Sequence, residues 1–179
     1  MNDSQTKFMT DFALSLFNSI VSSFVWVYVL IFFFRPRVVI SKNISKVFKK
    51  GKYTYQIKVI NRGRRDLFDL KMEAFIMTPR KIEGSTIFTR KKLITIPEEN
   101  SRLSRYKPKD EGASHAFRFT IDEELDQIWT NNENKFLTLR FYSTDGFSGM
   151  RNFQEIEFHD KKLAIIEGDF KTGSSLDIN

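Results

Sequence analysis

The chain has 179 residues and a formal net charge of +7, because 29 Lys and Arg side chains outnumber 22 Asp and Glu. With only 8 Gly and 4 Pro it is not a low-complexity or disordered protein. The roughly 145 residues after the apolar N-terminal segment allow one domain with a core but not two. The absence of Cys fits a reducing compartment.

The first element in chain order is an apolar run. Residues 12–34 contain no charged side chain, and a helix rising about 1.5 Å per residue over this length reaches across the roughly 30 Å hydrocarbon core of a bilayer. The run has neither the basic leader nor the small-residue cleavage site of a secretory signal. A buried helix of a soluble core is the alternative, but such a helix usually has a polar face. We predict a membrane-spanning helix over residues 12–34.

Basic residues follow the predicted span at once, and residues 35–52 contain no acid. Because Lys and Arg collect on the cytoplasmic side of membrane spans, we expect residues 1–11 outside and the chain after the span in the cytosol. The side chains expected to contact anionic headgroups are Arg35, Arg37, Lys42, Lys46, Lys49 and Lys50. The alternative for this run is a topogenic signal that binds no ligand.

Apolar and polar residues alternate in most of the remaining chain, which is the pattern of half-buried strands. In residues 52–61, for example, one face contains Tyr53, Tyr55, Ile57 and Val59, and a turn is expected directly afterwards, at residues 61–66. Strands are predicted over residues 37–42, 52–61, 67–77, 85–96 with an interruption, 114–121, 135–143, 150–158 and 163–170.

Two longer segments lie between these strands. Residues 97–112 form a polar loop, and residues 122–129 have the one helical pattern outside the predicted span. Asp122 is expected to cap this helix. Its apolar docking face is expected to consist of Leu125, Ile128 and Trp129. Residues 171–179 are expected to be a flexible tail.

About eight strands, one short helix and no alternation of strands with helices indicate an all-β domain over residues 53–170. Residues 35–52 supply a basic juxtamembrane segment and the first strand. Two architectures fit this pattern, a small eight-stranded β-barrel and an immunoglobulin-like sandwich, and the pattern alone does not separate them.

No catalytic or metal site is predicted. His115 and His159 are the only His residues, and each lies in or beside a predicted strand without a neighbouring ligand. Phosphate-loop, nucleophile-elbow and dinucleotide-binding motifs are absent. Solvation explains the acids of the predicted helix, such as Glu123, Glu124 and Asp126. We therefore expect no enzyme activity, no cofactor and no metal.

Small and weakly polar residues follow one face of the predicted membrane helix. At spacings of three and four, this face contains Ser15, Asn18, Ser19, Ser22 and Ser23. Such residues let membrane helices approach closely and hydrogen-bond across the contact. The alternative is that each serine bonds back to its own helix. We expect this face to associate with a second copy of the chain, giving a homo-oligomer.

Cationic side chains recur in the turns and loops of the β-domain. They form the clusters Arg62, Arg64 and Arg65; Arg80 and Lys81; Arg90, Lys91 and Lys92; and Arg102, Arg105, Tyr106 and Lys107. An Arg beside an aromatic ring suits a phosphate and a base, through forked hydrogen bonds and stacking, although each cluster alone is explained by solvated surface. We predict that Arg102, Arg105, Tyr106 and Lys107, in the long loop, bind a ligand. Duplex nucleic acid is not expected, because no recognition helix is present.

The layout of the chain resembles one family. An N-terminal membrane helix, then Arg35-Pro-Arg-Val-Val-Ile-Ser-Lys42, then Tyr55-Gln-Ile-Lys-Val-Ile-Asn61 and an eight-stranded cytosolic module, is similar to the membrane-anchored β-barrel effectors of bacterial anti-phage defence. The resemblance implies a barrel that senses a cyclic oligonucleotide and an effector that oligomerises and disrupts the inner membrane. The better-known members have two membrane spans, whereas this sequence predicts one.

We therefore expect a sensor-effector at the bacterial inner membrane, whose cytosolic β-domain binds a cyclic oligonucleotide and whose membrane helices assemble. The alternative is a membrane-tethered, immunoglobulin-like scaffold that docks a protein partner through an apolar patch or an exposed strand edge. A regulatory domain of a channel has the right topology, but the sequence contains no pore helix or filter.

Overall fold

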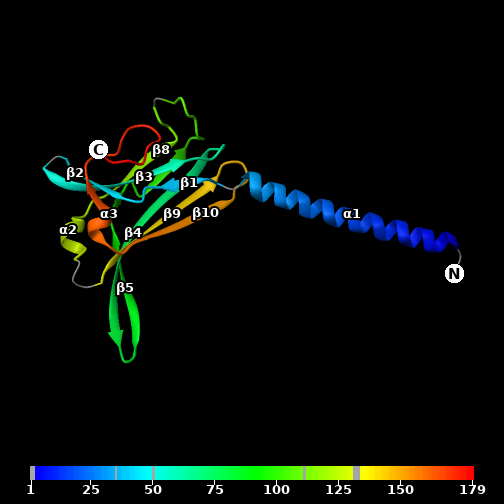
Figure 1. Ribbon diagram of the computed structural model, residues 1–179, viewed down its shortest axis with the longest axis horizontal. Helices are drawn as coiled ribbons and strands as arrows, with labels where there is room; N and C mark the ends of the chain where they lie inside the picture. The colour runs from blue at the N-terminus through cyan, green and yellow to red at the C-terminus, as the bar shows by residue number, and fades with distance from the viewer. Residues whose placement is uncertain (1–2, 35, 50, 111, 131–133) are drawn as a thin grey trace. The chain divides into compact units, whose positions relative to one another are not determined.

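The chain divides into two compact units, Met1–Arg35 and Pro36–Asn179. Figure 1 shows a helix in the first unit and β-structure in the second. The computed structural model describes residues 3–34, 36–49, 51–110, 112–130 and 134–179.

The first unit is a single helix, α1 (Asp3–Phe34). It begins earlier than predicted because residues 3–11 contain no Gly or Pro that would interrupt it. Its stretch Lys7–Leu30 is long and apolar enough to cross a membrane, and the most apolar part of this stretch is not buried by the rest of the chain. An exposed apolar helix of this kind indicates a membrane anchor or a signal sequence.

The second unit contains two β-sheets. The strands of the first sheet are β1 (Val38–Ile40), β2 (Ile44–Lys49), β3 (Lys52–Asn61), β6 (Thr95–Ile96), β8 (Ala116–Ile121) and β11 (Ile165–Glu167). Their order is β11-β2-β3-β8-β6, and β1 also pairs with β3. The pairing of β11 with β2 is parallel and the others are antiparallel.

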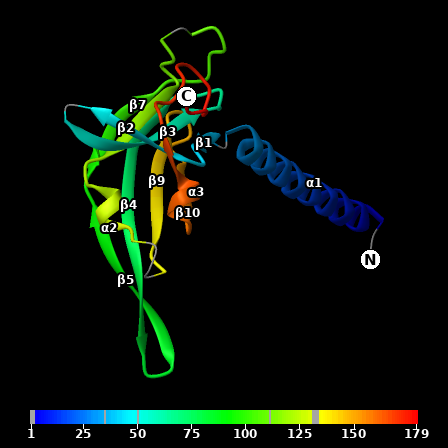
Figure 2. The same ribbon diagram turned by 60° about the vertical axis from the view of Figure 1, so that its left-hand side comes forward.

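The second sheet is built around one long strand. Its members are β4 (Leu67–Ile82), β5 (Ser85–Leu93), β7 (Glu99–Leu103), β9 (Phe136–Asp145) and β10 (Arg151–Phe158). The order is β10-β9-β4-β5, with β7 paired to β4. β4 continues past its predicted end at residue 77 because β5 pairs with it as far as Ile82. Figure 2 shows this β4–β5 hairpin extending beyond the remainder of the domain.

Apolar side chains from both sheets fill the space between them. Ile57 and Phe119 of the first sheet and Leu139 and Phe141 of the second are completely buried. The rings of Phe119 and Phe141 meet edge to face, with centroids 6.2 Å apart, so the two layers are in direct contact. The prediction of an all-β domain after an apolar helix is confirmed. Of the two architectures that the sequence allows, the structure has the sandwich and not the barrel that the resemblance implies, since strand pairing among the described residues gives two sheets.

The helices of the sandwich are shorter than the sequence predicts. In place of residues 122–129, α2 (Leu125–Ile128) spans four residues. Asp122 does not cap it and instead forms an ion pair with Lys52, while Glu124 precedes the helix without a side-chain capping bond. The predicted docking face is confirmed, because Leu125 and Trp129 are buried and Ile128 packs against the core.

Two predicted segments contain elements that the pattern missed. The expected loop 97–112 includes β7, which pairs with β4. The polar sequence of β7, Glu-Asn-Ser-Arg-Leu, does not show the alternation that predicts a strand. The expected strand 163–170 begins as a helix, α3 (Lys161–Ala164), capped by the Asp160 carboxylate, which accepts from the Lys162 N–H at 2.8 Å.

The C-terminal segment, residues 168–179, covers the polar face of β3. Lys58 is 2% exposed, and its Nζ donates to the carbonyl oxygens of Lys171 and Ser175, both at 2.7 Å. Burial lowers the pKa of Lys58 to about 8. The nearby Arg118 guanidinium reinforces this effect and the Asp169 carboxylate opposes it. Phe170 is 2% exposed. These contacts differ from the flexible tail that the sequence predicts.

Candidate ligand-binding site

Three connections meet at one end of the sandwich. Strand register places them together, because Leu67 at the start of β4 pairs with both Leu103, the last residue of β7, and Asp145, the last residue of β9. The turn before β4, the loop after β7 and the turn after β9 therefore lie side by side. We call this the basic end, after its cations Arg62, Arg64, Arg65, Arg102, Arg105, Lys107 and Lys109.

Asn61 holds the turn and the loop together. Its side chain is completely buried, and its amide nitrogen donates to the carbonyl oxygens of Arg65 at 2.6 Å and Ser104 at 3.0 Å. Its Oδ1 accepts from the Gly63 N–H at 2.8 Å. A Cβ at Gly63 would stand 2.9 Å from that oxygen, so only glycine fits there without a shift. Sequence reasoning missed this residue, which looks like one more polar strand end.

A second polar contact at the basic end is made by Asp66. Its carboxylate accepts from the Arg105 N–H at 2.7 Å and from the Arg102 guanidinium at 2.6 Å. Although partial burial acts to raise it, the pKa of Asp66 is held below its usual range by these two bonds. Arg102 also lies over the ring of Phe68, 5.9 Å from its centroid. The Arg102 charge is thus already balanced within the chain.

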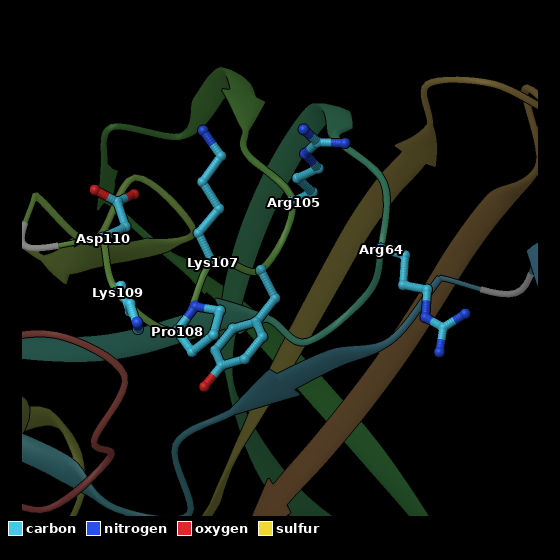
Figure 3. Close-up of a pocket in the computed structure, with 7 residues that line it drawn as sticks. Arg64, Arg105, Lys107, Pro108, Lys109 and Asp110 are labelled. Atoms are coloured by element: carbon cyan, nitrogen blue, oxygen red, sulfur yellow. The ribbon is translucent and has the colours of Figure 1, made fainter.

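An open pocket of about 630 Å³ lies on the loop side of the basic end. Figure 3 shows its lining, with Arg64 contributed by the turn and the others by the loop. The lining residues are Arg64, Arg105, Tyr106, Lys107, Pro108, Lys109 and Asp110. Within the part of the chain that the structure describes, the side chains of Arg64, Arg105, Lys107 and Lys109 form no ion pair. Four exposed cations thus surround a pocket that also has an aromatic ring and a proline.

Tyr106 links this pocket to the interior. The Arg62 guanidinium lies 5.5 Å from its ring centroid, and the His115 ring meets it edge to face, with centroids 5.0 Å apart. His115 is buried, and its Nε2 is 2.6 Å from the Ser174 Oγ of the C-terminal segment. Burial lowers the pKa of His115; the Asp110 carboxylate opposes this effect, and the charges of Arg62 and Lys58 reinforce it. The buried His115 ring thus supports Tyr106 from the interior.

The structure brings most of the predicted ligand-binding set together. Arg105, Tyr106 and Lys107 line the pocket. Arg102 lines a neighbouring groove of about 470 Å³, which Arg105 and Lys107 also line. The turn residue Arg64 and the loop residue Lys109 were not predicted as part of the site. Arg64 was noticed only as one of a separate cluster, because nothing local in the sequence shows that the turn and the loop are adjacent.

The other cationic clusters lie away from this pocket. Arg80 and Lys81 belong to the part of β4 in the hairpin. On β5, Lys91 pairs with Glu123 at 3.0 Å, Lys92 pairs with Glu98, and the Arg90 guanidinium covers the Phe75 ring. Surface pairing and packing explain these residues.

The predicted membrane-contact run is spread along the domain. Lys46 pairs with Asp126 at 2.8 Å and Lys49 with Asp169 at 3.4 Å. Both lie on β2, away from Arg37, whose carbonyl oxygen accepts from Arg62 N–H at 2.7 Å at the basic end. Lys42 is exposed, and Arg35 and Lys50 lie outside the described residues. The described basic residues of this run therefore do not gather on one surface of the domain.

Asp126 organises the contacts around Lys46. Its carboxylate also lies 3.0 Å from the Lys161 Nζ and accepts from the Tyr55 hydroxyl at 2.8 Å. Although burial acts to raise it, the bonds from Lys46, Lys161 and Tyr55 lower the pKa of Asp126 to about 2. Burial and the bond to Asp126 raise the pKa of Tyr55 to about 12. These groups stabilise the fold, and their hydrogen-bonding atoms are already engaged with one another.

The remaining predicted residues are His159 and the polar face of α1. His159 is exposed and lies against the Phe136 ring, with centroids 4.9 Å apart. Among the described residues, no group of three or more His, Asp or Glu could hold a metal. In α1, Ser19 and Ser23 donate to carbonyl oxygens four residues earlier, at 2.9 and 2.8 Å. These two hydroxyls therefore bond back to their own helix, which is the alternative to a contact between two helices.

Asn18 differs from its serine neighbours. The part of α1 that the structure describes offers its amide no hydrogen bond, and it lines an open groove with Ser15, Ser19 and Ser22.

No protein-family model matches the chain. No curated protein matches it. Among solved structures, the chain is similar to the periplasmic chaperone SfaE, with a TM-score of 0.38, 9% identity, and coverage of 80% of this chain and 60% of that one. It is also similar to the putative ApaA protein from Bordetella pertussis, with a TM-score of 0.35, 13% identity, and coverage of 69% and 91% respectively. The chain thus spans about 60% of the length of SfaE. Neither likeness bears on the function of this chain.

Proposed function

We propose that this protein is a membrane-anchored receptor whose β-sandwich binds a phosphate-bearing ligand of the cyclic oligonucleotide class at the basic end. One observation carries the proposal: four cations without ion pairs in the described chain surround a pocket that contains an aromatic ring. Unpaired cations repel one another, and an anion removes that repulsion.

The chemistry of the pocket favours a nucleotide over a simple phosphate. Arg64 and Arg105 have the planar guanidinium that binds phosphate through two hydrogen bonds, while Lys107 and Lys109 add point charges. Tyr106 and Pro108 supply apolar surface, on which a base can stack. The pocket of about 630 Å³ lies within the usual range of about 300–1,000 Å³ for small-molecule sites.

The rest of the proposal concerns α1. The helix anchors the sandwich in the inner membrane, with the basic residues after it in the cytosol. An Asn amide without a partner is costly in hydrocarbon, so Asn18 favours a contact between two copies of α1. Ligand binding to the sandwiches then promotes assembly of the helices, and the assembly disrupts the membrane.

Thermal unfolding of the purified full-length chain in detergent tests the ligand. A panel of cyclic di- and trinucleotides, with inorganic phosphate as a probe of charge alone, is compared with buffer. A ligand at 100 times its Kd adds about 2.7 kcal/mol, which raises the Tm by several degrees. We expect a selective shift that disappears in the double variant Arg105→Gln/Lys107→Gln and remains in the matched control Arg80→Gln/Lys81→Gln on the hairpin.

Three other results would redirect the proposal. A shift with phosphate as large as with any nucleotide would reduce the site to a general anion site. A shift that survives Arg105→Gln/Lys107→Gln would place the ligand elsewhere. A flat panel on a folded chain would contradict the receptor function.

The β4–β5 hairpin favours one other function, that of a protein-docking scaffold. Ile82, Ile87 and Phe88 are each about half exposed, at 51%, 47% and 52%, and β5 is the last strand of its sheet. Apolar residues on an edge strand provide a surface for a protein partner. Shortening the hairpin, as described in the Discussion, tests this function separately.

A further inference from the structure

We infer that the basic end of the sandwich also docks on the bilayer surface, with Phe147 and Met150 entering the headgroup layer and the surrounding arginines contacting anionic phospholipid headgroups. The inference rests on α1 being the membrane anchor of the proposed function. It does not depend on whether a nucleotide binds.

A short covalent connection joins α1 to the basic end. α1 ends at Phe34, and three residues of chain reach at most about 11 Å from there to Arg37. The Arg37 carbonyl oxygen accepts from the Arg62 N–H at 2.7 Å, so the basic turn is fixed to the first residues after the helix.

The turn after β9 is attached to the same place. The Gly146 N–H donates to the Asp66 carbonyl oxygen at 3.0 Å, and a Cβ at Gly146 would stand 2.4 Å from the Phe68 ring. The turn is therefore held tightly against the basic turn. At its tip, Phe147 is 75% exposed. Met150 lies at the base of the same turn, where its carbonyl oxygen accepts from the Asp145 N–H at 2.9 Å, and it is 43% exposed. Two large apolar side chains in water on one rigid turn favour burial elsewhere.

The charges around Phe147 complement an anionic membrane. The Arg65 guanidinium lies 4.4 Å from its ring centroid, and Arg64 is close by, since both arginines line the groove that Phe147 borders. The nearest acids present little free charge, because Asp66 is bonded to Arg102 and Arg105. Asp145 is buried, accepts from the N–H groups of Phe147 and Ser148 at 3.1 and 2.7 Å, and lies 3.8 Å from the Arg65 Nη1. Arg65 is thus partly balanced within the chain, whereas Arg64 forms no ion pair among the described residues.

An apolar tip surrounded by arginine is the arrangement with which peripheral segments enter a membrane interface. The apolar residues lie about 5–10 Å into the boundary between headgroups and acyl chains, and the cations contact lipid phosphates. The tether concentrates the domain at the surface, so even a weak surface contact is occupied. A protein partner at this end would lack that advantage, which is why we assign the surface to lipid.

The hairpin supplies an internal control. Its tip is at the far end of β4 from Leu67, about 50 Å away at 3.3 Å per residue. Thr86 is exposed there and pairs with Lys81. If the basic end lies on the bilayer, Thr86 stays in water.

The chain has no Cys, so one introduced thiol can be labelled selectively. The full-length protein with Met150→Cys, carrying an environment-sensitive fluorophore, is reconstituted into vesicles of neutral phosphatidylcholine and into vesicles containing phosphatidylglycerol. Lipids brominated in the acyl chain quench a fluorophore that enters the interface. We expect several-fold stronger quenching at position 150 than in the matched Thr86→Cys protein, and stronger quenching in anionic vesicles. Phe147→Ser, combined with Met150→Cys, should reduce the quenching to that of Thr86→Cys.

The outcomes separate the two proposals. A protein that does not float with vesicles of either composition would overturn α1 as anchor. A protein that floats but shows equal quenching at positions 150 and 86 would overturn the docking surface alone. Quenching that is equal in neutral and anionic vesicles would overturn the role of the arginines. Loss of quenching on addition of a cyclic dinucleotide would overturn the independence of docking from ligand binding.

Discussion

Asn61 illustrates how one buried side chain sets the geometry of a site that it does not line. Its amide bonds to two carbonyl oxygens on segments about forty residues apart, which fixes the spacing between the turn and the loop. The pocket cations are held by this framework and by Asp66. A change at Asn61 should therefore affect both stability and ligand binding.

Asn61→Ala should lower the free energy of unfolding by about 2–3 kcal/mol, because it leaves buried backbone groups without partners. The matched control is Asn100→Ala, at a half-buried position whose side chain accepts one bond of 3.3 Å from the Arg102 N–H, and it should cost less than about 1 kcal/mol. Urea denaturation measures both. Equal effects of the two variants would contradict the organising role of Asn61.

Because Lys58 is buried, we expect the free energy of unfolding to rise at alkaline pH. Its pKa is about 8 in the fold and 10.5 in the unfolded chain, so between these values the unfolded state binds more protons. Unfolding free energy therefore rises with pH from about 8 to 10.5. Lys58→Met should abolish this rise, while the exposed control Lys42→Met should keep it. Urea denaturation at several pH values measures the slope, and a rise that persists in Lys58→Met would show that another group causes it.

Individual residues were predicted well where burial follows from alternation along a strand. Tyr55, Ile57 and Val59 are buried as predicted, whereas Tyr53, predicted on the same face, is 47% exposed. Lys58, on the opposite face, is buried too, because a segment more than a hundred residues later covers it. Alternation within β3 contains no information on that contact. The same limit explains why Arg64 was not predicted as a partner of Arg105.

At the level of elements, the C-terminal segment is the largest difference from expectation. Gly and Ser residues predict a frayed end, but the Phe170 ring is buried. Arg118 also holds the segment through Asp169 and the Phe170 carbonyl oxygen, at 2.8 and 2.7 Å. Composition describes local stiffness, whereas order here comes from tertiary contacts.

Phe170→Ala should lower the free energy of unfolding by about 3 kcal/mol, since it removes a buried ring. The control Phe153→Ala removes a ring that is 55% exposed and should cost less than about 1 kcal/mol. The midpoints of urea denaturation give both values. If Phe170→Ala were as stable as Phe153→Ala, the prediction of a flexible tail would stand.

The β4–β5 hairpin should be separable from the fold. Replacing residues 80–87 by Asn-Gly, which favours a two-residue hairpin turn, should change the free energy of unfolding by less than about 1 kcal/mol, because the residues removed are exposed. Ligand-induced thermal shifts should remain. The scaffold function would be supported by two results together: the parent protein shows no thermal shift with nucleotides, and the shortened variant no longer binds a protein partner that the parent binds.

For the whole molecule, the sequence predicted the order of parts better than the arrangement within them. An apolar helix followed by an all-β domain is confirmed, since both follow from local hydropathy and alternation. A sandwich of two sheets was one of the two predicted architectures, and the pattern could not choose between them because the choice depends on which distant strands pair. β7 and β11 show this clearly: each is short, and each is defined by its partner.

Self-association of α1 is the prediction that belongs to the whole assembly. Ser15→Leu/Asn18→Leu/Ser22→Leu should weaken association of full-length chains in detergent about tenfold, since an interhelical hydrogen bond contributes about 0.6–2 kcal/mol. Phe17→Leu/Phe24→Leu, on the opposite face, should leave it unchanged. Energy transfer between labelled chains measures both, and equal association of the two variants would contradict this interface.

The parallel pairing of β11 with β2 has a consequence for synthesis of the protein. During translation, α1 leaves the ribosome first and is available to the membrane while β2 and β3 are still emerging. The outer edge of β2 must then wait for residues 165–167, about 120 positions later, before its ladder is complete. At roughly 5–20 residues per second, this interval lasts many seconds. Under the proposed function, in which α1 is a membrane anchor, the nascent domain is held at the membrane with an open sheet edge until β11 pairs.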